Sequence, residues 1–320
     1  ALINISRELK LLISRNSPPG GFRVWITILS LAFIAHTLVL NSQKLSEISL
    51  NTFSLSWLSF GLIISLLSLL INAFAWQLLL SWMGYVFRDI DLISLFLSSN
   101  LLKYLPGGIW HFVARLRALR THIGTGKAFN SVLLEPLLMA AAAMLWVPLG
   151  GFNLGLELIC IIPSFCFFKR FREPLLRRLE KIKSNQMERI YSEIRFVENI
   201  DDLGIERSSY PVKAFGMEML FILLRFGGFW CCLNAFNLEA TMPFFEWLSA
   251  FSLAWTIGLV IPAAPGGVGV FEAAILLGIG SQAPEPPLLV SLLCYRLITT
   301  FADLIAAWLA SVKSKLCFLS

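Results

Sequence analysis

Charged side chains are scarce in this chain: they make up 14% of its 320 residues, whereas hydrophobic residues make up 57%. An average soluble domain carries about 25% charged residues. The scarcity of charge, together with several apolar runs of about twenty residues, excludes an ordinary soluble protein and predicts an integral membrane protein. The longest polar stretch covers residues 169–213, which leaves no room for a separate soluble domain of ordinary size.

Side chains that carry chemistry are also sparse. The three histidines are scattered, and the six cysteines lie in or beside apolar segments without the spacing of zinc ligands. The sequence holds no Ser-His-Asp order, Walker loop or HExxH motif, and Asp89 and Asp91 form only a short D-x-D pattern. We therefore expect no metal, no cofactor and no catalytic residue. The net charge of +6 reflects basic cytoplasmic loops rather than nucleic-acid binding, because no face outside the apolar runs combines aromatic and basic residues.

Long apolar runs are abundant, and six of them predict transmembrane helices. The first run is longer than the apolar region of a typical signal peptide and is followed by no convincing cleavage site, so we interpret it as a retained helix. The six predicted spans cover residues 21–40, 54–82, 127–147, 152–168, 213–236 and 287–312.

Two further apolar regions are interrupted by the same Pro-Gly-Gly tripeptide, at residues 106–108 and 265–267. The first region has fourteen residues before its tripeptide, and the second has thirteen after its tripeptide, in residues 268–280. Helices of these lengths do not cross a hydrocarbon core of about 30 Å. The sequence therefore predicts two re-entrant helical hairpins, at residues 92–122 and 244–280.

The distribution of Lys and Arg orients these elements. The predicted outer loops contain a single basic residue, Lys44, whereas residues 169–213 contain eleven. This bias places both termini in the cytoplasm. The first hairpin then enters from the inside and the second from the outside, which is typical of an inverted repeat. The chain thus divides into a first half (1–168), a cytoplasmic amphipathic linker (169–212) and a second half (213–320). The linker either rests on anionic lipid headgroups or is a solvated connection.

The breaks and the charged residues near membrane depth are the candidate substrate-binding site. Irregular backbone at that depth is tolerated where it lines a cavity. The free N–H groups at a helix N-terminus after a glycine turn can bind an anion. Alternatively, the glycines only shape tight hairpins. Intramembrane ionisable residues are functional candidates, or they pair to hold helices together. Glu218 and Arg225 are seven residues apart and therefore share a helix face, as do Arg296 and Asp303. Glu135 is a weaker candidate of the same kind. The candidates are Pro106, Gly107, Gly108, Arg115, Arg225, Pro265, Gly266, Gly267, Gly269, Glu272, Arg296 and Asp303.

Three segments carry a family resemblance: "NLLKYLPGGIWHFVARLRAL", "IPAAPGGVGVFEAAILLGIG" and "YRLITTFADLIAA". From about Ser54 onward the chain resembles the lysylphosphatidylglycerol synthase transmembrane-region family, most specifically in PGG-x-G-x-x-E at residues 265–272. The resemblance implies movement of lipids between leaflets, and some family members are described as glycosyltransferase-like. It also implies a bacterial inner membrane. Synthesis of lysyl-lipid is not implied, because no aminoacyl-transferase domain follows Ser320.

The sequence therefore predicts an all-α polytopic membrane protein, with about six transmembrane helices and two re-entrant hairpins in an inverted repeat. Our leading hypothesis is a flippase-like protein that moves a phospholipid or another anionic lipid-linked substrate. The headgroup would lie between the hairpins, held by glycine N–H groups and by Arg115 or Arg296, with Glu272 paired to an arginine. The alternative is a membrane glycosyltransferase with a polyprenyl-phosphate sugar donor. Membrane lipids are the expected partners, and the sequence makes no prediction of the oligomeric state.

The charge distribution makes a direct prediction about topology. Single cysteines introduced near Lys44 and Ser281 should react with a membrane-impermeant thiol reagent from outside the cell. Cysteines near Thr121 and Asn185 should react only after the membrane is opened. Labelling of the Thr121 position from outside would contradict the first re-entrant hairpin and with it the inverted repeat.

Overall fold

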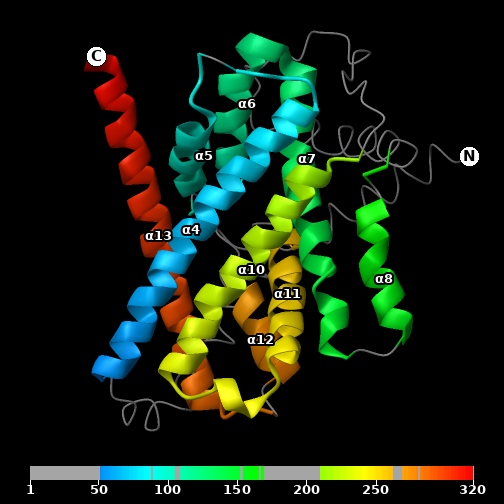
Figure 1. The fold of residues 1–320 in the computed structure, drawn as a ribbon, viewed down its shortest axis with the longest axis vertical. Coiled ribbons are helices and arrows are strands. Elements are labelled where there is room, and N and C mark those ends of the chain that lie inside the picture. The colour runs from blue at the N-terminus through cyan, green and yellow to red at the C-terminus, as the bar shows by residue number, and fades with distance from the viewer. Residues whose placement is uncertain are drawn as a thin grey trace, which may run out of the picture.

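A computed structural model of the chain describes eight stretches of it, and every regular element in them is helical (Figure 1). The described residues are 51–87, 89–104, 109–151, 154–165, 167–168, 210–261, 269–279 and 282–319. The elements are α4 (Thr52–Trp82), α5 (Leu92–Asn100), η1 (Leu101–Tyr104), α6 (Trp110–Ile123), α7 (Thr125–Met144), η2 (Val147–Gly150), α8 (Leu154–Phe165), α10 (Val212–Ala235), η3 (Glu239–Thr241), α11 (Phe244–Val260), α12 (Val270–Ile279) and α13 (Glu285–Leu319).

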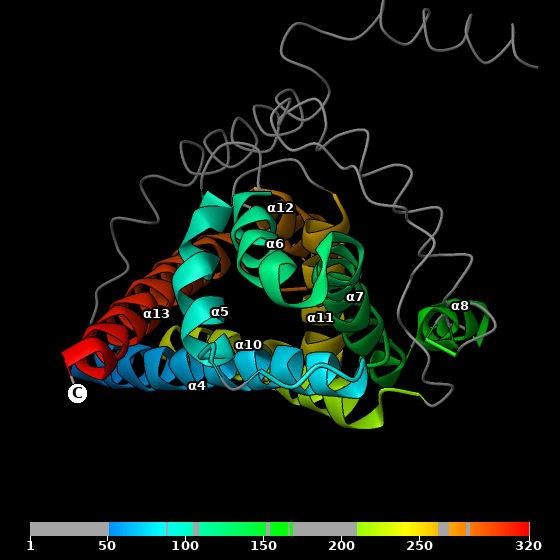
Figure 2. The ribbon, with the colours of Figure 1, turned by 90° about the horizontal axis from the view of Figure 1, so that it is seen from above.

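The long helices flank the short ones on three sides (Figure 2). Seen from above, α4 and α10 run along one side of the bundle, α13 and α7 form its flanks, and α5, α6, α11 and α12 lie between the flanks (Figure 2). Helix α8 stands apart from this bundle and contacts α7 and η2. The short helices therefore pack against one face of the α4–α10 layer, between its two flanks (Figure 2).

Four helices in the described part of the chain are long and apolar enough to cross a membrane: Thr52–Trp82, Thr125–Gly150, Val212–Ala235 and Glu285–Lys313. They agree with four of the six predicted spans. The first predicted span, 21–40, and residues 169–209 of the predicted linker lie outside the described residues.

The predicted span at residues 152–168 differs from the structure. Its helix, α8, has twelve residues, which corresponds to about 18 Å. That length is too short to cross the hydrocarbon core by itself. The prediction of an all-α polytopic membrane protein is confirmed, whereas the number of spans is not.

Each predicted hairpin region contains two short helices on either side of a break. In the first, α5 and η1 end at Tyr104 and α6 begins at Trp110; in the second, α11 ends at Val260 and α12 begins at Val270. The two helices of each pair contact one another. The first pair lies toward one end of the bundle and the second toward the other (Figure 1). An inverted repeat requires this arrangement, and the re-entrant topology itself stays a prediction.

Small residues bring α4 and α10 into close contact. A Cβ atom added to Gly61 of α4 would lie 3.1 Å from Cys231 Cβ and 3.3 Å from the carbonyl oxygen of Gly228, both on α10. Helices in membranes commonly pack through small residues, because apolar lipid offers no hydrophobic drive for larger side chains to associate. This contact fixes α10, which carries two of the buried charged residues described below.

The molecule carries apolar side chains outward and polar ones inward. On α13 the large residues Leu293, Leu297, Phe301, Leu304 and Trp308 are exposed along one helical stripe. Arginine, glutamate, aspartate and asparagine side chains are instead buried inside the bundle. In water this distribution would leave a long exposed apolar stripe, whereas lipid solvates it.

The two largest apolar clusters of the core both include residues of α13. One cluster surrounds the second helix pair and includes Phe251, Phe271 and Tyr295. The other surrounds the first pair and includes Phe96 and Ala302. Between Tyr295 and Ala302, α13 passes from one cluster to the other, and Arg296 and Asp303 lie at this junction.

The packing of α4 on α10 predicts the effect of a single methyl group. Gly61→Ala forces α10 to shift and should lower the free energy of unfolding by about 1–3 kcal/mol, with a lower midpoint of thermal unfolding in detergent. Gly216 on α10 has no atom within 4 Å of an added Cβ and is the matched control. Gly216→Ala should leave the midpoint unchanged or raise it, because alanine favours helix over glycine. Equal midpoints for both variants would contradict the close contact.

Candidate functional site

Asp303 of α13 binds the end of α5 and η1, which form the first arm of the first helix pair. Its carboxylate accepts hydrogen bonds from the amide Nδ2 of Asn100 at 2.8 Å and from the hydroxyl of Tyr104 at 2.6 Å. The ammonium of Lys103 lies 2.7 Å from the same carboxylate. Asp303 is fully enclosed, with 1% of its surface exposed. Three residues immediately before the first break are thus bound to one buried anion.

Arg225 of α10 forms a long ion pair with the same carboxylate, without a hydrogen bond to it. Its Nη2 lies 3.9 Å from Asp303 Oδ1, and its guanidinium lies 5.5 Å from the ring centroid of Phe221. Within the described residues Arg225 makes no hydrogen bond, although its side chain is only 8% exposed. A buried guanidinium has five N–H donors, so Arg225 retains its capacity to bind an anion.

Glu272 and Arg296 form a second ion pair beside the second break. Arg296 Nε donates to Glu272 Oε1, and Arg296 Nη2 donates to Glu272 Oε2 at 3.3 Å. Glu272 is the third residue of α12 and also accepts from the backbone N–H of Gly269 at 2.7 Å. This is the geometry by which a glutamate caps its own helix. Gly269 has a φ of +94°, a conformation that glycine adopts without strain.

These three ion pairs belong to one charged site, which we call the central cluster: Lys103, Arg225, Glu272, Arg296 and Asp303. Arg296 and Asp303 are seven residues apart on α13, about 10 Å along the helix axis. The charges of Arg225 and Arg296 both act on Lys103. The cluster thus contains three cations and two carboxylates. Lys103 and Arg296 keep 24% and 25% of their side-chain surface exposed, so the excess positive charge is accessible at two points.

Arg115 of α6 lies in a separate buried cluster. Its Nη1 donates to Glu135 Oε2 of α7 at 2.7 Å, and its Nε donates to Ser99 Oγ at 3.1 Å. The guanidinium also lies 3.7 Å from the ring centroid of Phe96 and 5.4 Å from that of Trp76. Arg115 is 1% exposed. Since two of its nitrogens donate to protein partners and its guanidinium lies near the rings of Phe96 and Trp76, Arg115 fixes α6 against α7, and we assign it a positioning role.

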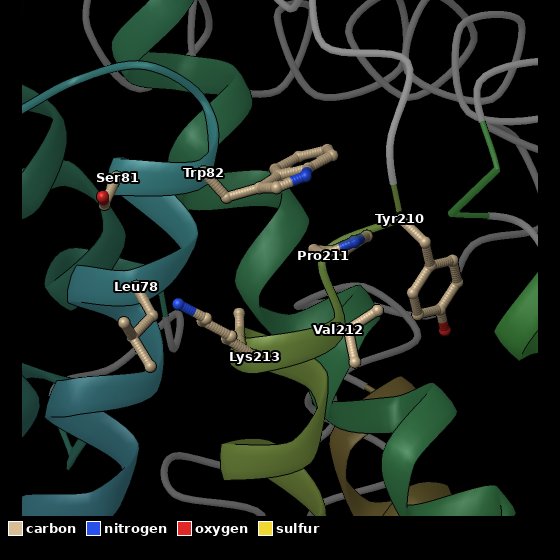
Figure 3. Close-up of a pocket in the computed structure, with 8 residues that line it drawn as sticks. Leu78, Ser81, Trp82, Tyr210, Pro211, Val212 and Lys213 are labelled. Carbon is tan, nitrogen blue, oxygen red and sulfur yellow. The ribbon is translucent and has the colours of Figure 1, made fainter.

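A cavity of about 350 Å³ lies away from the central cluster, between the end of α4 and the start of α10 (Figure 3). Ser81 and Trp82 line it from α4, and Lys213 points across it toward Leu78. Tyr210 lies at its edge, where burial raises the pKa of the phenol to about 12. The cavity therefore combines aromatic, hydroxyl and cationic groups at one end of the bundle.

The structure brings together four predicted site residues: Arg225, Glu272, Arg296 and Asp303. The expectation that Glu272 pairs with an arginine is met by Arg296. The expectation that glycine N–H groups hold the ligand changes at Gly269, because its N–H already binds Glu272. The candidates outside the described residues are Pro106, Gly107, Gly108, Pro265, Gly266 and Gly267.

Sequence reasoning missed three partners of Asp303: Asn100, Lys103 and Tyr104. A usable signal existed, since Lys103 lies three residues before Pro106 in an apolar region. An intramembrane lysine is a functional candidate by the same rule that selected Arg225. Asn100 and Tyr104 are common residues in apolar helices, and only their position opposite α13 identifies them.

These features define the class: an integral membrane protein with an all-helical bundle, apolar outer faces and charged residues inside. The chain belongs to the family of lysylphosphatidylglycerol synthase transmembrane regions, because its sequence matches that family over residues 22–307. A comparison with curated proteins gives no match.

The enclosed Arg115–Glu135 pair predicts strong coupling between the two residues. Glu135→Ala leaves a guanidinium buried without this carboxylate and should cost about 3–5 kcal/mol of stability. The comparison is Lys313→Ala, which removes an exposed ion pair with Asp91; the Lys313 side chain is 60% exposed. This variant should lose at most about 1 kcal/mol of stability. Thermal and denaturant unfolding in detergent would measure both.

The double variant Arg115→Leu with Glu135→Leu distinguishes the stability that comes from the ion pair from the stability that comes from burying each side chain. If the pair acts as a unit, the double variant loses less stability than the sum of the two single leucine variants. Additive losses would contradict the assigned positioning role.

Proposed function

We propose that this protein is flippase-like and moves a phospholipid, or another anionic lipid-linked substrate, between membrane leaflets. The observation that carries the proposal is the excess of positive charge in the central cluster, beside both helix breaks. Membership of the family supports the same class of function. We further propose the bacterial inner membrane as its location, with both termini in the cytoplasm, as the distribution of Lys and Arg indicates.

The phosphate of a lipid headgroup has the chemistry that the central cluster accepts. Arginine binds phosphate through two parallel N–H donors, and lysine binds it as a point charge. Arg225 contributes unbonded donors, while Lys103 and Arg296 contribute cationic groups that are partly exposed. One bound phosphate would balance the third cation of the cluster. The acyl chains would remain in lipid against the apolar outer faces.

The two carboxylates of the central cluster favour transport over glycosyl transfer. A transferase needs a carboxylate that is free to take a proton from the acceptor. Asp303 accepts from Asn100 and Tyr104 and contacts Lys103, while Glu272 accepts from Gly269 and Arg296. Both carboxylates therefore act as counter-charges that hold the cations in place.

Arg225→Gln tests the proposed headgroup site. A hydrogen bond to a charged group contributes about 1.5–3 kcal/mol, so the variant should bind anionic lipid about tenfold or more weakly. The measurements are mass spectrometry of co-purified phosphatidylglycerol and the rate of movement of a fluorescent phosphatidylglycerol in vesicles. Folding should be preserved, because Asp303 keeps its bonds to Asn100 and Tyr104.

Arg120→Gln is the matched control, since it makes the same change of charge at an exposed position of α6. It should leave lipid movement at the wild-type rate. Wild-type movement per folded molecule of Arg225→Gln would overturn the proposed site. Transfer of a sugar from a polyprenyl-phosphate donor, without movement of phosphatidylglycerol, would replace the proposal with the glycosyltransferase.

A further inference from the structure

The cavity of Figure 3 lies at the level where two membrane-spanning helices end. Leu78, Ser81 and Trp82 line it from the end of α4. Val212 and Lys213 line it from the first turn of α10. Both helices are long and apolar enough to cross a membrane, and the ends of such helices lie at the depth of the lipid headgroups. The cavity is therefore at the right depth to meet a headgroup.

The cavity opens to the outside of the bundle. Ser81 and Lys213 are exposed, and 69% of the surface of Val212 is exposed. Leu79 and Leu80, which precede Ser81 on α4, are instead buried in the core. Since lipid surrounds the outer faces of α4 and α10, a molecule in the membrane can reach the cavity from the side.

An apolar stripe continues from the cavity along α4. Its members follow at intervals of three or four residues and so lie on one helix face: Leu67, Leu70, Phe74 and Leu78, with Ser81 at the end. The first three are exposed large apolar side chains. From Ser81 to Leu67 the helix covers about 21 Å, which is more than half of a hydrocarbon core of about 30 Å. A polar end followed by such a stripe matches a phospholipid, whereas free phosphate would use only the polar end.

Lys213 supplies a positive charge to the cavity. Its side chain points across the cavity toward Leu78 (Figure 3), and it forms no hydrogen bond or ion pair with the described residues. The described residues that line the cavity include no acidic side chain. A lysine near the end of a spanning helix directs its ammonium group to the level of the headgroups. An anion in the cavity would therefore supply the counter-charge of Lys213.

Aromatic rings give the cavity a wall that is already in place. Trp82 and Tyr210 belong to the residue types that are enriched where a membrane meets water. The ring centroid of Tyr210 lies 5.0 Å from that of Phe168 and 5.6 Å from that of Phe215. Packing within the protein thus fixes this ring. The volume of about 350 Å³ is within the range of ligand sites in proteins.

We propose that this cavity, which we call the peripheral lipid site, binds the headgroup of an anionic phospholipid. Lys213 would contact the phosphate, and an acyl chain would follow the stripe on α4. Phosphatidylglycerol fits the site better than phosphatidylethanolamine, because the described lining offers a cation for the phosphate and no carboxylate for an ammonium group. The bound lipid would join the end of α4 to the start of α10. This lipid stays at the outer face and is separate from the one that the central cluster would move.

Native mass spectrometry of the full chain in detergent tests the peripheral lipid site, with phosphatidylglycerol and phosphatidylethanolamine of the same acyl chains as probes. Arg225→Gln is the starting protein, so that lipid in the central cluster contributes little. One phosphatidylglycerol should bind to it, more tightly than phosphatidylethanolamine. Adding Lys213→Gln should weaken this binding about fivefold, which is the effect of one lysine near an anionic membrane surface. Adding Ser81→Trp instead should weaken it severalfold, because the indole ring fills the cavity.

Arg120→Gln is the matched control, since Arg120 is an exposed cation of α6 and is not among the lining residues. It should leave the affinity unchanged. Equal losses for Lys213→Gln and Arg120→Gln would reduce the effect to surface charge and overturn the site, as would an unchanged affinity of Lys213→Gln or Ser81→Trp. Displacement of the lipid by inorganic phosphate would identify a site for free phosphate instead. Thermal unfolding midpoints check that each variant is folded, and Lys213→Arg should retain binding.

The same titration of wild-type protein separates this proposal from the proposed function. Wild-type protein should bind a second phosphatidylglycerol that Arg225→Gln loses and Lys213→Gln keeps. If Arg225→Gln binds as much lipid as wild type, the headgroup site in the central cluster fails, and the loss caused by Lys213→Gln still supports the peripheral lipid site. If Lys213→Gln alone binds as wild type does, the peripheral lipid site fails, and the effect of Arg225→Gln still tests the headgroup site.

Discussion

The bonds to Asp303 are the interaction on which the arrangement of this protein depends. A carboxylate inside an apolar bundle is stable only with close partners, and Asp303 obtains them from Asn100 and Tyr104, about two hundred residues earlier in the chain. These bonds attach the end of the first helix pair to α13. The same helix carries Arg296, which binds Glu272 of the second pair. One helix therefore connects both breaks.

Charged side chains are buried in two clusters inside the bundle, the central cluster and the cluster around Arg115. The central cluster has one cation more than its carboxylates, which suits a phosphate. In the cluster around Arg115, the guanidinium is paired with the carboxylate of Glu135. In both clusters ion pairs compensate charge inside a membrane protein, where an unpaired charge is costly. The α4–α10 contact at Gly61 supports both clusters, since α10 contributes Arg225 to one and Glu218 to the other.

Much of the fold follows from the sequence, because a helix that crosses a hydrocarbon core must be long and apolar. A span needs about twenty apolar residues, so four predicted spans coincide with long helices of the structure. The breaks are recognisable because proline and glycine end helices. The span predicted at residues 152–168 shows the limit of this reasoning, since an apolar run of seventeen residues contains a helix of only twelve. Composition shows how apolar a segment is, whereas the length of its helix depends on local packing.

The sequence by itself determined the class of protein, the four long helices, the positions of the breaks and the presence of buried ionisable residues. Only the tertiary structure decided the partners of those residues. Arg115 was a candidate for binding lipid, yet it lies enclosed against Glu135, whereas Lys103 was overlooked and contacts Asp303. The physical reason is that apolarity and helix periodicity are local properties of the chain. An ion pair between distant helices depends instead on how those helices pack, and packing is set by contacts across the whole bundle.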